Sequence, residues 1–383
     1  MDAAEVSVET STIDPLSIAR RLGPVFAERA ANTDDSDEFV AANFRDIKES
    51  GLVEAGVPAD LGGAGASVAD LSAMLRELGR HCGSTALAFS MHTHQVAIPA
   101  WRWTYQKAAP VAPLLKRVAA ERIILLSSGG SDWVAGSGKA ERVEGGYRIT
   151  ARKIFSSASP VGDILMTGAV LEDEPDGPMV LHFGVPMRSP AVKVLDNWKT
   201  MGMRGTASND VLIDGYVAPE ASIGAKRKQG QWHPLFEIIA MVAFPLIYAA
   251  YLGVAEGARD IAVAAARKRR GSHHVVELVG RMDTELRAAQ YAHQAMLATV
   301  ARGEPGAATT NEIMIGRSLV ARHALATADL AMEAAGGAAF YRSNGLERRF
   351  RDIQGARYHP MQPGPQSEFA GKMALGLDIS TTF

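Results

Sequence analysis

The chain has 383 residues, of which 47% are hydrophobic, and its formal net charge at pH 7 is -2. This length is enough for two or three packed layers, and the balanced charge gives no sign of a nucleic-acid or membrane partner. The single cysteine, Cys82, permits no intrachain disulfide, so we expect a protein of a reducing compartment, the cytoplasm.

The first third of the chain is helical in pattern. Residues 1–17 are acidic and have no apolar core, which is typical of neither a secretory signal nor an Arg-rich transit peptide. Apolar residues then recur at helical spacing to about residue 103, with a glycine-rich break at 51–67. We predict an N-terminal α-helical domain over residues 1–120.

The middle third is rich in short β-type runs bounded by Gly, Pro, Asp and Ser. These runs lie at 123–126, 147–150, 164–170, 179–185 and 211–213. Their spacing leaves no room for long helices between them, and no GxGxxG follows a strand, so a Rossmann-type fold is not expected. We predict a central antiparallel β-barrel domain over residues 121–225.

The last third is again helical. Long Ala-rich patterns at 235–269, 275–302 and 311–335 predict a C-terminal four-helix bundle domain over residues 226–383, and their wide apolar faces predict a homo-oligomer. Residues 238–255 are apolar for about the length of a membrane helix. Because alanines, two tyrosines and Pro245 dilute this run, we interpret it as a core helix.

Two polar segments stand out, whereas CxxC, HExxH and GxSxG motifs are absent from the sequence, so no metal site is predicted. The segment SSGGSDW, residues 127–133, could line a flat polar ligand or its phosphates, or form an ordinary turn. In RKIFSSAS, residues 152–159, strand alternation would place Phe155 and Ser157 on one face, which suits the edge of an aromatic heterocycle. A solvated serine beside a core phenylalanine is the alternative.

These segments, together with several others in the same order, resemble the acyl-CoA dehydrogenase superfamily of flavoproteins over nearly the whole chain. The matching motifs are VPADLGGAG at 57–65, GGSD at 129–132, GYRITARKIFSSAS at 146–159, GMRGTASNDV at 202–211, ARKRRG at 266–271, and EAAGG with RFRD near the end. The resemblance implies an α+β multidomain fold, with FAD (or FMN) between the barrel and the bundle. It also implies a homotetramer or homodimer in which an adjacent subunit completes the cofactor site.

The resemblance also implies roles for individual residues. Phe155 falls where the family packs a tryptophan on the flavin ring, Ser157 where a threonine bonds flavin N5, and Arg267 where an arginine reaches the FAD pyrophosphate. The cofactor-binding residues expected on this basis, with the two serines of the 127–133 segment, are Ser127, Ser128, Gly130, Ser131, Asp132, Phe155, Ser157, Arg267, Gly336 and Gly337.

The usual catalytic glutamate is missing. The position eight residues after the aspartate of the RD motif is Pro360, and the alternative position on the first bundle helix is Ala243. His359 stands beside the vacant position, and an imidazole is suited to proton transfer near neutral pH. A histidine at this place also occurs in the flavin monooxygenases of this fold, which resemble the chain further at Ser157 and in a helix that here offers His92 and His94.

The catalytic residues predicted are therefore His359, Ser157, His94 and His92. The main interpretation is a flavin-dependent oxidoreductase that oxidises an acyl thioester or similar small molecule, with His359 as an atypical base and an electron-transfer flavoprotein as possible partner. The alternative is a monooxygenase that uses reduced flavin and O2 through a C4a-hydroperoxide, supplied by a flavin reductase. A catalytically inactive flavin-binding protein is the third possibility.

Overall fold

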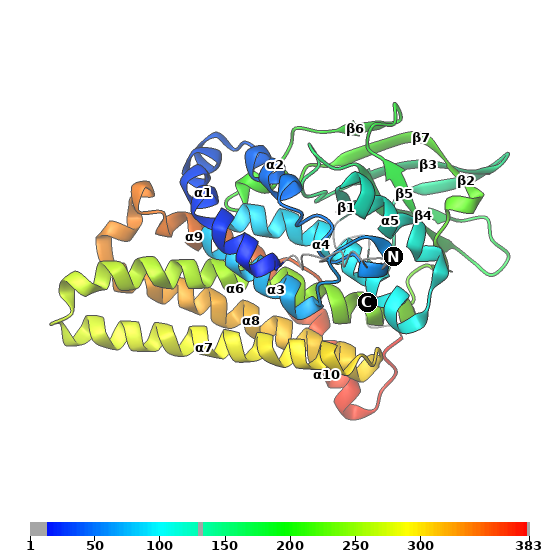
Figure 1. Cartoon of the computed structure of the whole chain (residues 1–383). Helices are drawn as coiled ribbons and strands as arrows, with labels where there is room; N and C mark the ends of the chain where they lie inside the picture. Colours follow the sequence, from blue (N-terminus) through cyan, green and yellow to red (C-terminus); the bar gives the residue numbers. More distant parts are fainter. Residues whose placement is uncertain (1–13, 129–132, 381–383) are drawn as a thin grey trace, which may run out of the picture.

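The computed structural model describes residues 14–128 and 133–380 of the chain. The sheet lies at one end of an elongated molecule, and the long C-terminal helices extend from it to the other end (Figure 1). The N-terminal helices are α1 (Pro15–Ser36), α2 (Ala41–Glu49), α3 (Val68–His81), α4 (Gly83–Gln106) and α5 (Ala112–Glu121). Capping fixes where two of them begin. Asp14 accepts the Leu16 N–H at the start of α1, and Ser67 forms a capping box with Asp70 at the start of α3.

The central strands form one eight-stranded sheet. They are β1 (Leu125–Ser127), β2 (Lys139–Val143), β3 (Gly146–Lys153), β4 (Ile164–Leu171), β5 (Met179–Pro186), β6 (Val192–Val194), β7 (Val211–Pro219) and β8 (Ala225–Lys228). The order along the sheet is β6-β7-β3-β2-β4-β5-β8, with β1 paired to β4. Most pairs are antiparallel, but β4 pairs in parallel with both β1 and β2. The domain predicted as an antiparallel β-barrel is therefore one sheet in which most, but not all, strand pairs are antiparallel.

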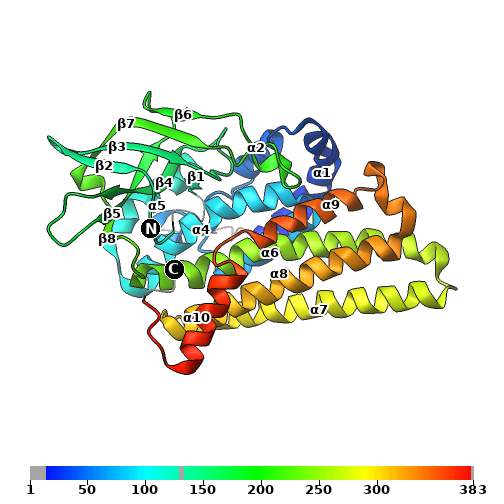
Figure 2. The same cartoon turned by 180° about the vertical axis from the view of Figure 1, so that it is seen from behind.

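The C-terminal helices are α6 (Pro234–Ala266), α7 (His273–Arg302), α8 (Ala307–Ala335), α9 (Leu346–Ile353) and α10 (Pro363–Leu375). The long helices α6, α7 and α8 run side by side, and α10 packs against α8 near the sheet end (Figure 2). The prediction of a core helix over the apolar run is confirmed, because 94% of the most apolar window of this helix is buried inside the protein.

Helix α4 joins the two ends of the molecule. It packs on α6 along its length and also contacts β1, so its side chains face both the bundle and the sheet. The predicted sequence of helical, sheet and helical regions is confirmed by this arrangement. The exact domain boundaries after residues 120 and 225 stay predictions.

Candidate functional site

The segment after β3 presents an aromatic ring to solvent. β3 ends at Lys153, and Phe155 adopts a left-handed backbone with φ of 56°, so the strand alternation predicted to align Phe155 with Ser157 is wrong. The Phe155 ring is nevertheless 51% exposed and meets Trp198 edge to face, with centroids 6.0 Å apart. A large apolar side chain held at the surface in this way offers a flat contact for a ligand ring.

Ser157 is buried at the head of a chain of hydroxyl groups. Its Oγ lies 2.8 Å from Ser208 Oγ, which lies 2.7 Å from Thr206 Oγ1. Thr206 in turn donates to the Met203 carbonyl at 2.9 Å. The Thr206 proton is committed to the Met203 carbonyl, so Ser208 donates to Thr206 and Ser157 donates to Ser208. The Ser157 oxygen therefore faces a ligand as a hydrogen-bond acceptor.

Backbone strain gathers around these hydroxyls. Phe155, Ala158, Met203 and Ala207 all have left-handed φ values between 41° and 61°. Such conformations cost non-glycine residues free energy and persist only where the surroundings enforce them, which is typical of ligand sites. The two strained stretches are joined by a backbone hydrogen bond from the Ala158 N–H to the Thr206 carbonyl.

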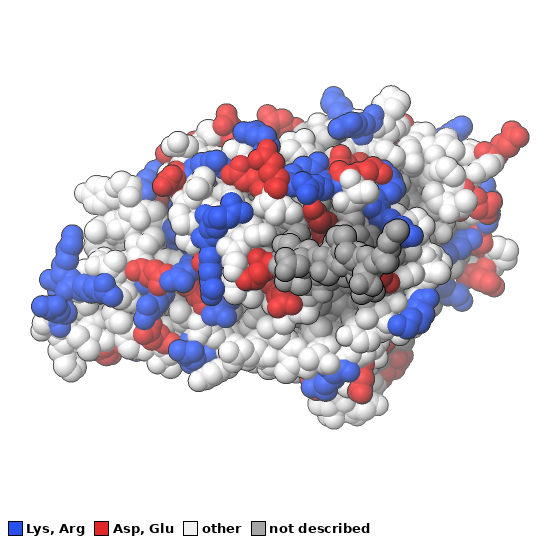
Figure 3. Space-filling view, viewed as in Figure 1, with Lys and Arg blue, Asp and Glu red and all other residues white. Residues whose placement is uncertain are grey.

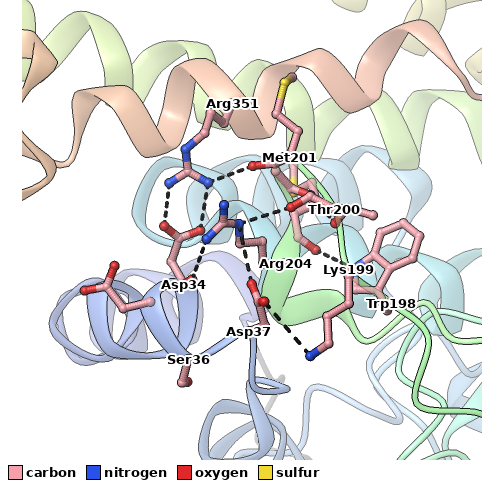
Figure 4. Close-up of polar contacts among 12 residues, drawn as sticks. Asp34, Ser36, Asp37, Trp198, Lys199, Thr200, Met201, Arg204 and Arg351 are labelled. Atoms are coloured by element: carbon pink, nitrogen blue, oxygen red, sulfur yellow. Dashed lines mark hydrogen bonds and ion pairs between the residues drawn. The ribbon is translucent and has the colours of Figure 1, made fainter.

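The RD motif of α9 holds the loop that carries this strain. We call residues 198–208 the clamped loop. Asp352 accepts the Met203 N–H, and Arg351 donates to the Met201 carbonyl at 2.8 Å. The Arg351 guanidinium also binds both carboxylate oxygens of Asp34 at the end of α1 (Figure 4).

A second pair of ions extends the clamp toward α1. Arg204 donates to the Asp34 carbonyl at 3.2 Å and lies 3.5 Å from Asp37, which Lys199 also approaches (Figure 4). Burial raises the pKa of Asp352 to about 6, although the hydrogen bond from the Met203 N–H acts in the opposite direction and lowers it. Three parts of the chain that are distant in sequence therefore fix one loop beside Ser157.

His359 lies in the turn between α9 and α10, against α6. Its Nε2 is 2.8 Å from the Tyr251 hydroxyl, and its ring packs edge to face on that tyrosine. Burial lowers the pKa of His359 to about 3, and the positive charge of Arg317 acts in the same direction, as His94 does when it is protonated. The imidazole is therefore neutral at physiological pH, and it lies within electrostatic reach of His94.

Arg317 supports this turn from α8. It is 1% exposed, donates to the His359 carbonyl at 2.7 Å, and stacks over the Tyr248 ring at 5.0 Å. Among the described residues, no carboxylate forms an ion pair with it. Burial lowers the pKa of Arg317, but a guanidinium still keeps its proton at physiological pH. Its positive charge lies close to His359 and disfavours a second proton on the imidazole.

The two predicted histidines of α4 have different environments. His92 donates from Nε2 to the Val53 carbonyl at 2.9 Å and accepts the Leu125 N–H on Nδ1 at 3.0 Å, so both ring nitrogens are satisfied by backbone. His94 donates from Nδ1 to the Ser90 carbonyl at 2.9 Å, which leaves Nε2 as an acceptor near the Gln95 amide. Backbone groups satisfy both nitrogens of His92, whereas His94 Nε2 has only a long contact of 3.4 Å with the Gln95 amide, so His94 is the better placed of the two to accept from a ligand.

The structure does not bring every predicted cofactor residue to this place. Arg267 follows α6, and Gly336 and Gly337 follow α8, at the end of the bundle away from the sheet (Figure 1). The exposed residues 267–270 gather positive charge there (Figure 3). Within one chain, these residues cannot form a single site with Ser157, and a role for them needs an adjacent subunit.

The serines at the end of β1 lie against α4 and β4. Ser127 Oγ contacts the Met91 sulfur of α4 at 3.6 Å, and Ser128 Oγ lies 3.0 Å from Thr167 Oγ1. The predicted residues Gly130, Ser131 and Asp132 lie outside the described residues.

Sequence reasoning missed Tyr251, Arg317 and Asp34. Tyr251 and His359 are 108 residues apart, so their contact has no local pattern. One signal was available, because a tyrosine inside a long apolar helix needs a partner for its hydroxyl. The described residues thus include an exposed aromatic ring at Phe155, an acceptor hydroxyl at Ser157, and two neutral imidazoles, His359 and His94, that lie within electrostatic reach of each other.

Comparison with known proteins identifies the class. Models of the acyl-CoA dehydrogenase N-terminal domain and C-terminal domain match residues 19–115 and 246–362, more than half of the chain together. An amino sugar nitrososynthase of Streptomyces peucetius is 28% identical over 94% of this chain and 93% of its own length. The order of helical, sheet and helical regions is that of the flavin-dependent oxidoreductases of this family. The chain belongs to the acyl-CoA dehydrogenase superfamily.

Solved structures have the same fold. KijD3 in complex with FMN and a dTDP-linked amino sugar superposes with a TM-score of 0.87 at 24% identity, covering 97% of this chain and 96% of that one. The FMN-bound dibenzothiophene monooxygenase of Paenibacillus sp. A11-2 gives a TM-score of 0.84 at 20% identity, covering 96% and 99%.

Proposed function

We propose that this protein is a flavin-dependent monooxygenase, which uses reduced flavin and O2 to transfer one oxygen atom to a small organic substrate. The observation that carries the proposal is the environment of His359. A base that removes a proton from carbon needs high proton affinity, whereas burial and Arg317 lower the pKa of this imidazole to about 3. Neither Pro360 nor Ala243 offers a carboxylate instead. Thioester dehydrogenation, our main interpretation from the sequence, is therefore the less favoured reaction.

The relatives support the same choice. Those that match over most of the chain include two amino sugar nitrososynthases and a pigment production hydroxylase, although a putative acyl-CoA dehydrogenase of Bacillus subtilis is among them too. The structural relatives named above contain FMN. We therefore propose FMN rather than FAD, delivered in the reduced state by a separate reductase. The bound flavin supplies two electrons and activates O2.

The residues of the chain would divide the remaining work. Phe155 would pack on the flavin ring, and Ser157 would accept a hydrogen bond from its polar edge, because the Ser157 proton is donated to Ser208. His359 would contribute a neutral imidazole, and His94 would contribute an acceptor nitrogen. An acceptor nitrogen favours a substrate with an N–H or O–H group, which His94 would orient by accepting its hydrogen bond in place of the Gln95 amide.

Labelled oxygen tests this function. The protein is loaded with FMN, reduced without O2 present, and then exposed to ¹⁸O2 with a panel of amines, thioethers and phenols. We expect ¹⁸O in a product, detected by mass spectrometry, and loss of that product by about 10²-fold or more in His359→Ala. Bleaching of oxidised FMN by an acyl thioester under nitrogen, with no label in any product, would instead support a dehydrogenase.

A further inference from the structure

The hydrogen bond to His359 sets the position of its proton. Tyr251 lies on α6 and is fully buried, and burial raises its pKa well above 10, so its hydroxyl keeps its proton. That proton has one recorded acceptor among the described residues, which is His359 Nε2 at 2.8 Å. A phenol that accepted from an Nε2–H instead would leave its own buried O–H without a partner, which is unfavourable.

The surroundings exclude the doubly protonated ring as well. The Arg317 guanidinium binds the His359 carbonyl at 2.7 Å, and no described carboxylate pairs with it to offset a second positive charge. With Nε2 accepting from the phenol, the single imidazole proton lies on Nδ1. No hydrogen bond within the described residues occupies Nδ1.

We propose that Tyr251 is a positioning residue that holds His359 as the Nδ1–H tautomer, so that the imidazole presents a hydrogen-bond donor to the reacting oxygen. This inference rests on the proposed monooxygenase function. His94 completes the arrangement from α4, because its Nδ1–H is bound to the Ser90 carbonyl and its Nε2 can only accept, as it does from the Gln95 amide at 3.4 Å, a long contact that a substrate donor could replace. The site then holds two imidazoles whose hydrogen-bonding roles are fixed. His359 donates a hydrogen bond to the reacting oxygen, and His94 accepts one from the substrate.

The neighbouring turn of α6 provides a matched control. Tyr248 is also fully buried and packs against the His359 ring, with centroids 6.4 Å apart. Its hydroxyl, however, donates to the Ala356 carbonyl at 2.8 Å and not to the imidazole. Tyr251→Phe and Tyr248→Phe therefore each remove one buried hydroxyl from the same helix, but only the first removes the partner of Nε2.

Nitrogen NMR reads the tautomer directly. The full-length protein is labelled with ¹⁵N-histidine, and the His359 signals are assigned by their loss in His359→Gln. In the wild type we expect a protonated Nδ1 and an unprotonated Nε2. Tyr251→Phe should shift both nitrogens toward a mixture of tautomers, and Tyr248→Phe should retain the wild-type signals. A wild-type Nε2–H form, unchanged signals in Tyr251→Phe, or equal changes in both variants would overturn the proposal.

A second readout follows the reaction. In Tyr251→Phe we expect product formed per reduced flavin to fall about tenfold or more, with the lost electrons appearing as hydrogen peroxide, since a positioned proton donor contributes about 10²–10⁴ in rate. Tyr248→Phe should stay close to the wild type in this ratio, and an equal loss in Tyr248→Phe would contradict a specific role for Tyr251. If no substrate incorporates labelled oxygen, the proposed function fails, and the NMR experiment still decides whether Tyr251 fixes His359.

Discussion

At the scale of single residues, hydrogen-bond partners separate structural from functional histidines. His92 and His94 lie two positions apart on α4, and both are buried. Burial lowers the pKa of each to about 4, so charge does not distinguish them. The distinction lies in their partners, because backbone groups occupy both nitrogens of His92 and only one of His94.

Phenylalanine substitutions test this distinction while keeping the packed volume. His92→Phe leaves the Val53 carbonyl and the Leu125 N–H without partners, so we expect the free energy of unfolding to fall by about 2–4 kcal/mol. His94→Phe removes a partner only from the Ser90 carbonyl, which belongs to the helix, and from the half-buried Gln95 amide, which water can reach. The loss of stability should therefore be about 1 kcal/mol or less, while product formation falls about tenfold or more. Urea unfolding and turnover measure the two effects. Equal losses of stability would contradict the assignment.

At the scale of elements, the RD motif works as a clamp on a strained loop. The clamped loop carries Met203, Thr206 and Ser208, so its position sets the hydroxyls that reach Ser157. The contact with α9 is so close that an added Cβ on Gly202 would lie 2.3 Å from the Arg351 carbonyl oxygen. Glycine is needed here because of this approach.

Gly202→Ala should therefore push the clamped loop away from α9. We expect a loss of about 1–3 kcal/mol in the free energy of unfolding, from overpacking, together with weaker FMN binding measured by flavin fluorescence. The control is Gly280→Ala on the exposed face of α7, where a new Cβ meets nothing within 4 Å. That change should stabilise the helix by about 0.5–1 kcal/mol without altering FMN affinity. Wild-type FMN affinity in Gly202→Ala would show that the clamp does not shape the site.

At the scale of the whole molecule, the sequence predicts what depends on local pattern. Helical periodicity and short β-type runs predict the three regions correctly, and the family resemblance places Ser157 and His359 beside the interface between sheet and bundle. The contacts that organise the site join residues 149 positions apart at Met203 and Asp352, and 108 apart at Tyr251 and His359. Such pairs follow from packing of whole elements, so local pattern cannot reveal them. The left-handed Phe155 was missed for the same reason, because its conformation is imposed by neighbours.

Folding also buries several histidines in the neutral form, which makes the whole molecule sensitive to acid. Burial lowers the pKa of His359 to about 3 and that of four others to about 4; these are His92, His94, His182 and His293. All of these pKa values lie below the ordinary histidine value of about 6.5. Between the lowered values and about pH 6.5, the unfolded chain therefore binds more protons than the folded chain. The stability that these groups contribute is present above about pH 6.5 and is lost as the pH falls toward 4.

His293→Gln tests this acid sensitivity away from the site. His293 donates from Nε2 to the Pro245 carbonyl at 2.9 Å, and a glutamine amide can supply the same donor without a titrating group. Urea unfolding over a series of pH values should show that the variant loses stability less steeply near pH 5, by about one proton, or about 1.4 kcal/mol per pH unit. Above pH 7 the two curves should run parallel, because both side chains are neutral there. An unchanged slope near pH 5 would mean that burial does not hold this imidazole neutral, and the acid sensitivity would then need another origin.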